Sequence, residues 1–302
     1  MGTPQLEVDY ASVDGDTKPG VAGFLKMKAA NVKLVTPRGI YGRPAGGQSP
    51  VFKDPVWLRD KDDIVAAGLN RSSYILLCVP RSGMYTPEPE IQIDAFADYV
   101  QVDRPVLGKK PHDLVPCIDV EEASDILSPS AYYDWVLRAA KRFRTRYGVW
   151  PAIYTSERVW HEYLGDHLAG QLAACPLWIA KPWPVPPNSP AIMDGAPTYQ
   201  PTLIPQYGTA WISYQFQGDA LGVPGISHTA DLSRTRILGQ GANGQQVMWI
   251  QARAGGLAID GSWGPLTTAR IKQVQGLYAL DADGLVGIDT NTLLSWLNPA
   301  PL

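Results

Sequence analysis

Short apolar runs alternate with longer amphipathic stretches over most of the chain. An apolar run bounded by turn residues predicts a buried strand, and apolar positions at helical spacing predict a helix. The predicted strands cover residues 32–35, 74–79, 114–120, 151–154, 177–180 and 211–216. The predicted helices between them cover residues 62–67, 90–102 and 130–147. Such alternation indicates a parallel sheet, and five or more units favour a TIM-like (β/α) barrel with its chemistry at the C-terminal strand ends.

The clearest of these helices is the one at residues 130–147. Ser128 or Ser130 is placed to cap its first turn. Its apolar stripe consists of Tyr133, Val136, Leu137, Ala140 and Phe143. The other side carries Arg138, Lys141, Arg142, Arg144 and Arg146. We interpret this charge run as a solvated helix face.

The pattern changes after a glycine-rich polar stretch at residues 239–244, which has the composition of a linker. Two matching turns follow, Asp260-Gly-Ser-Trp-Gly-Pro-Leu-Thr267 and Asp283-Gly-Leu-Val-Gly-Ile-Asp-Thr290. Glycine permits the positive φ of tight turns, and each threonine is placed to cap the next helix. Short amphipathic helices are expected at residues 247–254, 268–277 and 290–297. We therefore expect a barrel domain at 1–238, a linker at 239–246 and a small helical domain at 247–302.

Composition and charge remove several classes of function. A net charge of −3 argues against a nucleic-acid-binding surface, which would need a basic patch. No apolar run reaches about 18 residues, so no membrane insertion is expected. The first residues lack the basic and apolar regions of a Sec signal peptide, so we expect synthesis in the cytoplasm and another exit route.

The three cysteines, Cys78, Cys117 and Cys175, each lie within an apolar run. Their odd number and their spacing fit neither a zinc site nor a disulfide framework. We interpret them as buried thiols of a protein made in a reducing compartment, with a nucleophilic Cys117 as the minor alternative.

The strongest candidate for chemistry is a pair of acids where the 114–120 strand ends. Asp119 and Glu121 are two residues apart, so their side chains point to the same side of the strand, with β-carbons roughly 7 Å apart. Like charges this close disfavour joint ionisation, so one pKa should rise. A raised carboxyl pKa suits a general acid near neutral pH. Glu122 falls on the opposite side, and the competing interpretation is that both acids simply face water.

Several other motifs accompany this pair in a set order. They are Val8-Asp9, Ile153-Tyr-Thr-Ser156 with Trp160, Leu177-Trp-Ile-Ala180, Trp211-Ile-Ser-Tyr-Gln-Phe216, and Ala230-Asp231-Leu232. With Asp119-Val-Glu121 they resemble the glycoside hydrolase family 25 lysozymes, which cut peptidoglycan between N-acetylmuramic acid and N-acetylglucosamine. The resemblance covers about the first 235 residues. It implies an irregular α/β barrel in which a few antiparallel strands complete the ring.

The two Asp-Gly-x-x-Gly-x-x-Thr turns near the C-terminus resemble the three-helix peptidoglycan-binding domain. The combination looks like a phage or prophage endolysin, or a related wall hydrolase. It implies bacterial peptidoglycan as the partner, reached in the host periplasm or wall after holin-type release. We expect no cofactor, no metal, and a monomer.

The resemblance also implies roles for the acids. Glu121 would act as general acid and then as base, with net retention. Asp119 would raise the pKa of Glu121 and position the substrate's N-acetyl group or stabilise the cation. Asp9 and Asp231 would complete an acidic cluster at the barrel mouth. Whether the intermediate is a glycosyl-enzyme or an oxazolinium stays open.

Aromatic residues near the strand ends are candidates for stacking on sugar rings. They are Tyr154, Trp178, Trp211 and Tyr214, of which alternation should send about half to the core. Arg38 is placed either to bind a substrate carboxylate or to pair with one of the acids. In the C-terminal domain Asp260, Trp263 and Asp283 are the candidate wall-binding residues. Trp249, Trp263 and Trp296 favour core positions, and Trp263 is the best exception because it lies in a turn.

The sequence departs from the family pattern near its start, where Asp9 is followed by Tyr-Ala-Ser rather than Val-Ser. Asp14 and Asp16 are additional acids there with no assigned role. Two other functions remain open. A zinc amidase would need converging ligands, which the scattered histidines do not provide. A non-catalytic wall-binding or virion protein with a lysozyme-like barrel is the alternative that the acid set disfavours.

Overall fold

The computed structural model describes residues 5–12, 18–164, 172, 175–180, 188–193, 211–235 and 237–297, without the side chains of residues 211 and 212. Asp14 and Asp16 lie outside this part of the chain.

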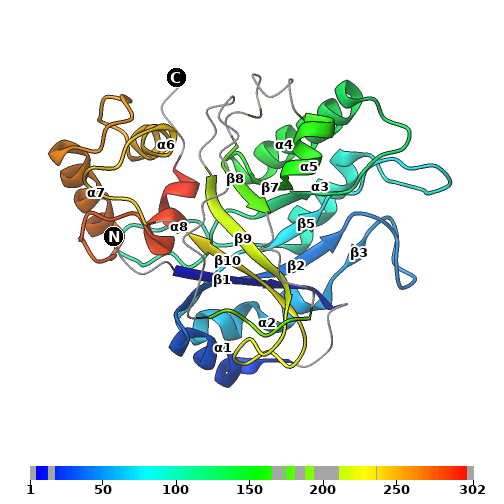
Figure 1. The fold of residues 1–302 in the computed structure, drawn as a ribbon, viewed down its shortest axis with the longest axis horizontal. Coiled ribbons are helices and arrows are strands. Elements are labelled where there is room, and N and C mark those ends of the chain that lie inside the picture. The colour runs from blue at the N-terminus through cyan, green and yellow to red at the C-terminus, as the bar shows by residue number, and fades with distance from the viewer. Residues whose placement is uncertain are drawn as a thin grey trace.

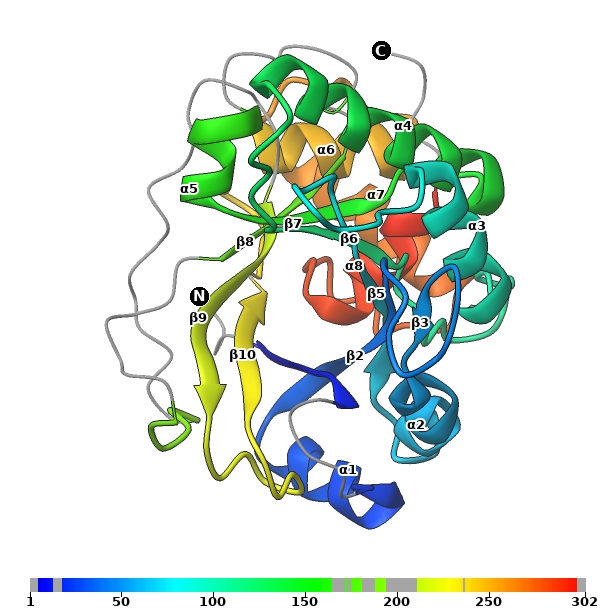
Figure 2. The same ribbon diagram turned by 90° about the vertical axis from the view of Figure 1, so that its right-hand side faces the viewer.

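Eight strands of the described residues close a ring, which Figure 2 views end-on. In order they are β1 (Gln5–Tyr10), β10 (Ala230–Thr235), β9 (Trp211–Ala220), β8 (Leu177–Ala180), β7 (Ala152–Ser156), β6 (Cys117–Val120), β5 (Tyr74–Leu76) and β2 (Val32–Tyr41). The pairing of β1 with β2 closes the ring. β10 is antiparallel to both of its neighbours, and the other ring pairs are parallel. The expected α/β barrel with antiparallel closure is confirmed.

Two short strands pair with β2 outside the ring, β3 (Phe52–Lys53) antiparallel and β4 (Asn70–Arg71) parallel. Helices lie around the outside of the barrel (Figure 1). They are α1 (Gly20–Ala29), α2 (Pro55–Ala66), α3 (Pro89–Tyr99), α4 (Pro129–Tyr147) and α5 (Glu157–Val159), which continues into the π-helical turn η2 (Trp160–Leu164).

The longest helix, α4, begins and ends where its sequence favours it. The Ser128 hydroxyl accepts a hydrogen bond from the Ala131 N–H, so Ser128 rather than Ser130 is the cap. At the other end Gly148 adopts a left-handed φ of 76°, and its N–H donates to the Arg144 carbonyl. In the predicted apolar stripe Val136, Ala140 and Phe143 are fully buried in the main core, and Tyr133 and Leu137 are partly buried against it.

The C-terminal segment forms three helices with an apolar core of their own. They are α6 (Gln245–Ala254), α7 (Pro265–Leu277) and α8 (Ile288–Trp296). The stretch before α6 is bonded to both turns, because Leu238 exchanges backbone hydrogen bonds with Val286, and Trp263 does so with residues 241 and 242. This stretch is therefore held in place despite its linker-like composition.

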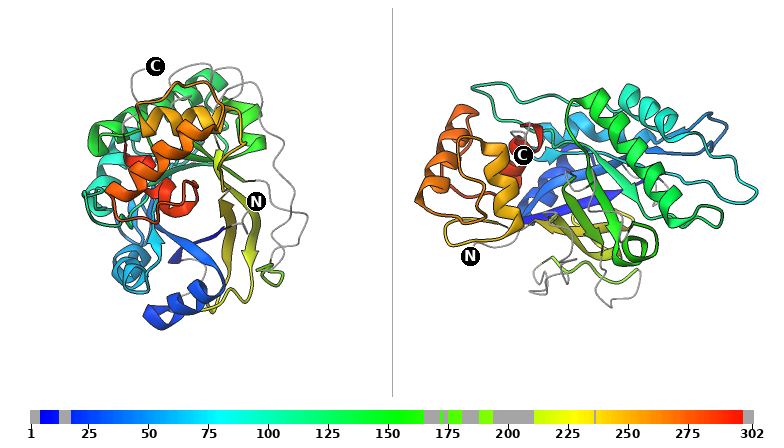
Figure 3. Two further views of the ribbon diagram at one scale, coloured as in Figure 1. Left: turned by 90° about the vertical axis from the view of Figure 1, so that its left-hand side faces the viewer. Right: turned by 90° about the horizontal axis from the view of Figure 1, so that it is seen from above.

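The three helices pack against the end of the barrel where the parallel strands begin (Figure 3). Trp296 of α8 belongs to the main apolar core, and its Nε1 donates to the Asp113 carbonyl at 2.6 Å. The Ile288 N–H donates to Gln5 Oε1 at 2.7 Å, at the start of β1. The opposite end of the barrel, where those strands finish, stays uncovered by these helices. No helix in the described residues is long and apolar enough to cross a membrane.

Candidate functional site

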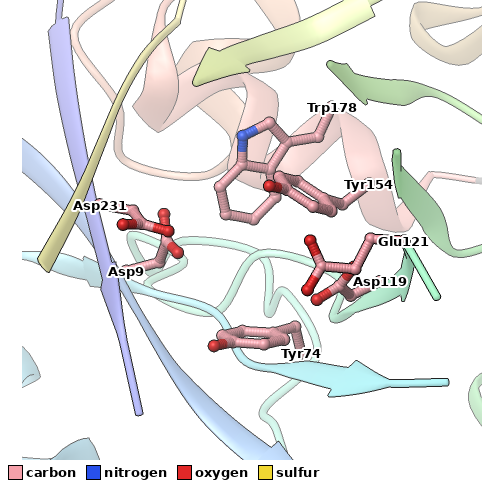
Figure 4. Close-up of a pocket in the computed structure, with 7 residues that line it drawn as sticks. All are labelled: Asp9, Tyr74, Asp119, Glu121, Tyr154, Trp178 and Asp231. Carbon is pink, nitrogen blue, oxygen red and sulfur yellow. The ribbon is translucent and has the colours of Figure 1, made fainter. Parts of the chain in front are cut away.

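The C-terminal ends of the parallel strands surround an open cavity (Figure 4). Its lining consists of Asp9, Tyr74, Asp119, Glu121, Tyr154, Trp178 and Asp231. Six of these seven side chains were predicted from the sequence, and Tyr74 was not. The structure therefore brings together all four acids that were proposed for catalysis.

Asp119 and Glu121 lie on one side of this cavity. Asp119 is an inward-facing residue of β6 and is 6% exposed, whereas Glu121 follows the strand and is exposed at the mouth. Burial raises the pKa of Asp119 well above its usual range, and the charges of Glu121 and Asp9 add to this rise. Asp119 Oδ1 is buried and lacks a hydrogen-bond partner within the described residues. It is therefore poised to contact a bound ligand.

The pKa of Glu121 is raised as well, first because its carboxyl is desolvated inside the cavity and then by the charge of Glu122, while Arg38 opposes the rise. The repulsion between Asp119 and Glu121 raises the pKa of Asp119, the member of the pair that holds its proton more firmly. Glu122 lies outside the cavity lining, as alternation predicted. Its carboxylate pairs with Arg43 at 2.7 Å and accepts the Val79 N–H.

Asp9 and Asp231 face this pair from the other side. They are directly opposite each other in the antiparallel pairing of β1 with β10, which explains why residues so distant in sequence meet. Asp231 accepts hydrogen bonds at both oxygens, from Gln215 Nε2 at 2.6 Å and from the Asp219 N–H at 2.7 Å. The two sides together make a cavity lined by carboxyl groups.

Aromatic rings form the remaining walls. Trp178 and Tyr154 meet edge to face, with ring centroids 5.2 Å apart, and Tyr74 lies on the opposite wall. Trp178 Nε1 donates to Ser233 Oγ at 3.0 Å. Tyr74 is the first residue of β5. As an aromatic residue at a strand end, it meets the same criterion by which Tyr154 was selected. These faces suit a sugar ring.

Tyr214 was wrongly predicted to contact substrate. It is 0% exposed and belongs to the main core, because β9 turns its neighbour Gln215 inward instead, against Tyr154. Alternation along the strand requires that either Tyr214 or Gln215 points inward, but it does not determine which of them does. The side chain of Trp211 lies outside the described residues.

Arg38 does not reach the cavity lining. Its guanidinium pairs with Asp54, with Nη2 2.9 Å and Nε 3.0 Å from Oδ2. Asp54 is fully buried and also caps α2 by accepting the Val56 N–H. Arg38 thus pairs with an acid that the sequence analysis did not consider, although its charge lowers the pKa of both Asp119 and Glu121.

In the C-terminal helices Asp260 and Asp283 are exposed residues that organise the two turns. Trp263 is 3% exposed, and its Nε1 donates to Thr268 Oγ1, so its ring is part of the small core and not a surface platform. The threonine caps are also corrected. The N-cap residues of α7 and α8 are Gly264 and Gly287, and Thr267 and Thr290 lie within the first turn of each helix.

A buried glutamine holds each of these turns, which the sequence analysis missed. Gln275 donates to Asp283, to the Leu285 carbonyl and to Thr290, and accepts the Gly284 N–H. Gln251 makes the same four bonds to the first turn. The repeat therefore includes a glutamine eight or nine residues before each aspartate, as the two numberings show.

The three cysteines are free and buried. Burial raises the pKa of Cys117 well above its usual range, and the charge of Asp119 adds to the rise, which opposes thiolate formation. Among the described residues, no three side chains of histidine, cysteine, aspartate or glutamate are grouped as ligands for a metal ion.

A family model matches most of the barrel, and several solved structures have a similar fold. The family model described as "Glycosyl hydrolases family 25" matches residues 38–225. The fold is similar to a bacterial lysozyme from Streptomyces coelicolor (TM-score 0.57, 20% identity, 78% of this chain and 93% of that one). It is also similar to a muramidase from Acremonium alcalophilum (TM-score 0.56, 18% identity, 77% and 93%). The catalytic domain of the endolysin ply40, from bacteriophage P40 of Listeria monocytogenes, gives a TM-score of 0.51 at 14% identity, over 78% and 95% of the chains.

One curated relative shares a shorter segment. A zinc D-Ala-D-Ala carboxypeptidase from Streptomyces albus G is 40% identical over 57 residues, which is 17% of this chain and 22% of that protein. The chain thus spans about a fifth of that relative's length.

Proposed function

The chain belongs to glycosyl hydrolases family 25, and on this premise we propose that it cleaves the β-1,4 bond between N-acetylmuramic acid and N-acetylglucosamine in bacterial peptidoglycan, with net retention. The observation that carries the proposal is the carboxyl pair Asp119 and Glu121, both with raised pKa, inside a cavity walled by aromatic rings. Glycoside hydrolysis uses two such carboxyl groups.

Glu121 is the proton donor to the leaving glycosidic oxygen, because it stands at the exposed mouth and its raised pKa keeps the acid form available. As a carboxylate it then takes a proton from the incoming water. Asp119 lies deeper and holds its own proton more firmly, so we assign it to positioning the sugar. Asp9 and Asp231 supply negative charge beside the developing oxocarbenium centre.

Comparing Glu121→Gln with the wild type on purified peptidoglycan tests this assignment. Loss of a general acid should reduce the release of reducing ends by about 10²–10⁴-fold. Glu162→Gln, on an exposed residue paired with Arg158, is the matched control and should cleave like the wild type. Equal release by Glu121→Gln and wild type would refute the catalytic role, and release of amino groups would indicate peptide or amide cleavage. Proton NMR of the first-formed anomer tests retention.

We further propose that the C-terminal helices anchor the enzyme to the cell wall. The enzyme acts on the wall from outside the cytoplasm, as a monomer. The two matched turns support this part of the proposal, because both are built on the same buried glutamine scaffold. In the Glu121→Gln background the full chain should sediment with purified sacculi. Adding Asp260→Ala and Asp283→Ala should weaken this binding by loosening the turns. Unchanged sedimentation of a folded variant would argue against anchoring through them.

A further inference from the structure

A chain of hydrogen bonds runs behind one wall of the cavity, from β7 past β8 to β9 and β10. The Tyr154 hydroxyl on β7 lies 2.6 Å from Gln215 Oε1 on β9, and Gln215 Nε2 lies 2.6 Å from Asp231 Oδ2 on β10. We propose that Gln215 is a positioning residue, which commits the Tyr154 proton away from the cavity and so presents the Tyr154 oxygen to the bound sugar as a hydrogen-bond acceptor. This inference deepens the proposed function and rests on it.

The direction of the chain is fixed at its Asp231 end. Both Asp231 oxygens receive N–H donors, one from Gln215 and one from the Asp219 backbone, which stabilises the ionised carboxylate. A carboxylate can only accept, so the amide nitrogen of Gln215 must face it. The amide oxygen is therefore turned toward Tyr154. Because that oxygen can only accept, Tyr154 must be the donor.

A phenol has one proton, so this bond leaves only lone pairs on the side of Tyr154 that lines the cavity. Burial, with the charges of Glu121 and Asp119, raises the pKa of Tyr154 well above its usual range, so the proton stays on the oxygen. Trp178 is committed in the same way, since its Nε1 donates to Ser233. Neither aromatic neighbour then offers a polar hydrogen to the cavity.

This wall therefore recognises a sugar by the hydrogens that the sugar donates. Tyr154 and the carboxylate of Asp231 both accept, and the closest matching groups on an N-acetylated sugar are hydroxyl and amide N–H groups. An anionic substituent on the sugar has no donor to offer here and would meet like charge. We expect such a substituent to point out of the cavity.

A double-mutant cycle on binding tests the inference without depending on turnover. The full chain carrying Glu121→Gln is titrated by calorimetry with a soluble tetrasaccharide of alternating N-acetylglucosamine and N-acetylmuramic acid. Tyr154→Phe removes the acceptor and should weaken Kd by about 10-fold, the value of one neutral hydrogen bond. Gln215→Met keeps the side-chain length but frees the Tyr154 proton, and should weaken Kd similarly. The double variant should bind no more weakly than Tyr154→Phe alone.

Gln217→Met is the matched control, because Gln217 is a buried glutamine of the same strand that bonds to residues 189, 190 and 192. Its effect should add to that of Tyr154→Phe. Additive effects of Gln215→Met and Tyr154→Phe, or binding unchanged by either, would overturn the inference. So would an absence of tetrasaccharide binding. Failure of the proposed function is seen separately, as equal reducing-end release by wild type and Glu121→Gln.

Gln215→Glu provides a second readout that a purely structural role would not produce. When protonated, Glu at this position still donates to Asp231 and accepts from Tyr154, so the chain of bonds survives. When ionised, it no longer donates to Asp231 but still accepts from Tyr154, so the Tyr154 proton stays turned away from the cavity in either state. Tetrasaccharide binding by Gln215→Glu should therefore stay closer to that of the parent protein than binding by Gln215→Met does. Binding as weak as that of Gln215→Met would contradict the proposed bond direction.

Discussion

Glu7 is a buried carboxyl group that the proposed mechanism does not use. It lies two residues before Asp9 on the same inward face of β1, and is 2% exposed. Its oxygens meet the hydroxyls of Thr36 at 3.0 Å and Ser213 at 2.7 Å. Burial raises the pKa of Glu7 to about 7, and the two hydroxyls only partly offset the effect. The interior of the barrel thus holds a carboxyl that prefers to be neutral.

Substituting Glu7 with glutamine should change how stability depends on pH. The folded pKa exceeds the unfolded value of 4.5, so the unfolded state ionises first as pH rises. The wild type therefore loses stability between pH 4.5 and 7, in total on the order of 3 kcal/mol. Glu7→Gln should lack this loss and gain on the wild type as pH rises toward 8. Urea unfolding at several pH values measures the difference.

The matched control is Glu88→Gln, on an exposed residue paired with Arg138. It should follow the wild-type pH dependence of stability. Parallel wild-type and Glu7→Gln curves from pH 4 to 8 would mean that Glu7 is already ionised in the folded protein.

Removing the charge of Glu122 should shift the pH profile of catalysis. Glu122 raises the pKa of Glu121 but lies outside the cavity, so Glu122→Gln should lower that pKa. The acid form of Glu121 would then be lost at lower pH, and the alkaline limb of kcat/KM would move to lower pH. A pH–rate series on soluble glycan measures the shift. An unmoved limb, in a variant with wild-type thermal stability, would show that Glu121 is not the titrating acid.

At the level of helices, the predicted solvent face of α4 is exposed at Arg138, Lys141 and Arg144, and it also carries ion pairs to a neighbouring helix. Arg138, Arg142 and Arg146 of α4 pair with Glu90, Asp94 and Asp98 of α3. The periodicity of α4 shows the three arginines on one stripe, but only the position of α3 supplies their partners. Arg144 is different, because its guanidinium lies 4.9 Å from the centre of the Trp150 ring.

How far sequence reasoning reaches depends on whether a feature is local. Alternation alone joined Asp119 to Glu121, and the spacing of apolar runs predicted the barrel, because both depend on neighbours in the chain. The meeting of Asp9 with Asp231 needed the resemblance, since it is set by strand pairing across the closed ring. Tyr214 was predicted to face inward where the structure has Gln215, because the neighbouring strands decide which face of β9 points inward. Helix α1 was not predicted, because only three of its residues are buried and its apolar periodicity is therefore weak. The buried residues are Gly23, Phe24 and Met27.

The glutamine of the second turn allows a test at the scale of one element. Gln275→Leu keeps a side chain of similar size but leaves the Gly284 N–H and the Leu285 carbonyl without their hydrogen-bond partner. Unsatisfied buried groups of this kind should cost about 2–4 kcal/mol in free energy of unfolding. Urea unfolding followed by tryptophan fluorescence measures the loss. Gln273→Leu, on the exposed side of the same helix, should stay within about 0.5 kcal/mol. Equal losses of stability in Gln275→Leu and Gln273→Leu would show that the bonds of Gln275 do not stabilise the turn.

At the scale of the whole molecule, the C-terminal helices are fixed to the barrel rather than tethered to it. Asn70 Nδ2 donates to Asp289 Oδ1 at 2.6 Å, and the Gly108 N–H donates to the Leu277 carbonyl at 2.8 Å. With the contacts of Gln5 and Asp113, these bonds join α7 and α8 to the ends where β1 and β6 begin. The candidate site lies at the other end of the same strands. Under the proposed anchoring, a glycan strand bound by the helices would therefore not be the stretch that enters the cavity.

Trp296→Ala should accordingly destabilise the barrel and not only the helices that carry it. Trp296 is mostly buried, packs in the barrel core, and lies 5.9 Å from the Arg104 guanidinium. Loss of so large a side chain should cost about 3–5 kcal/mol, and both parts should unfold in one transition. Calorimetry, with residual activity after heating as the readout for the barrel, measures this. Leu266→Ala, at an 80% exposed position of α7, should leave both unchanged. A Trp296→Ala variant that melts in two steps, with the heat inactivation of the barrel unmoved, would show that the two parts are energetically independent.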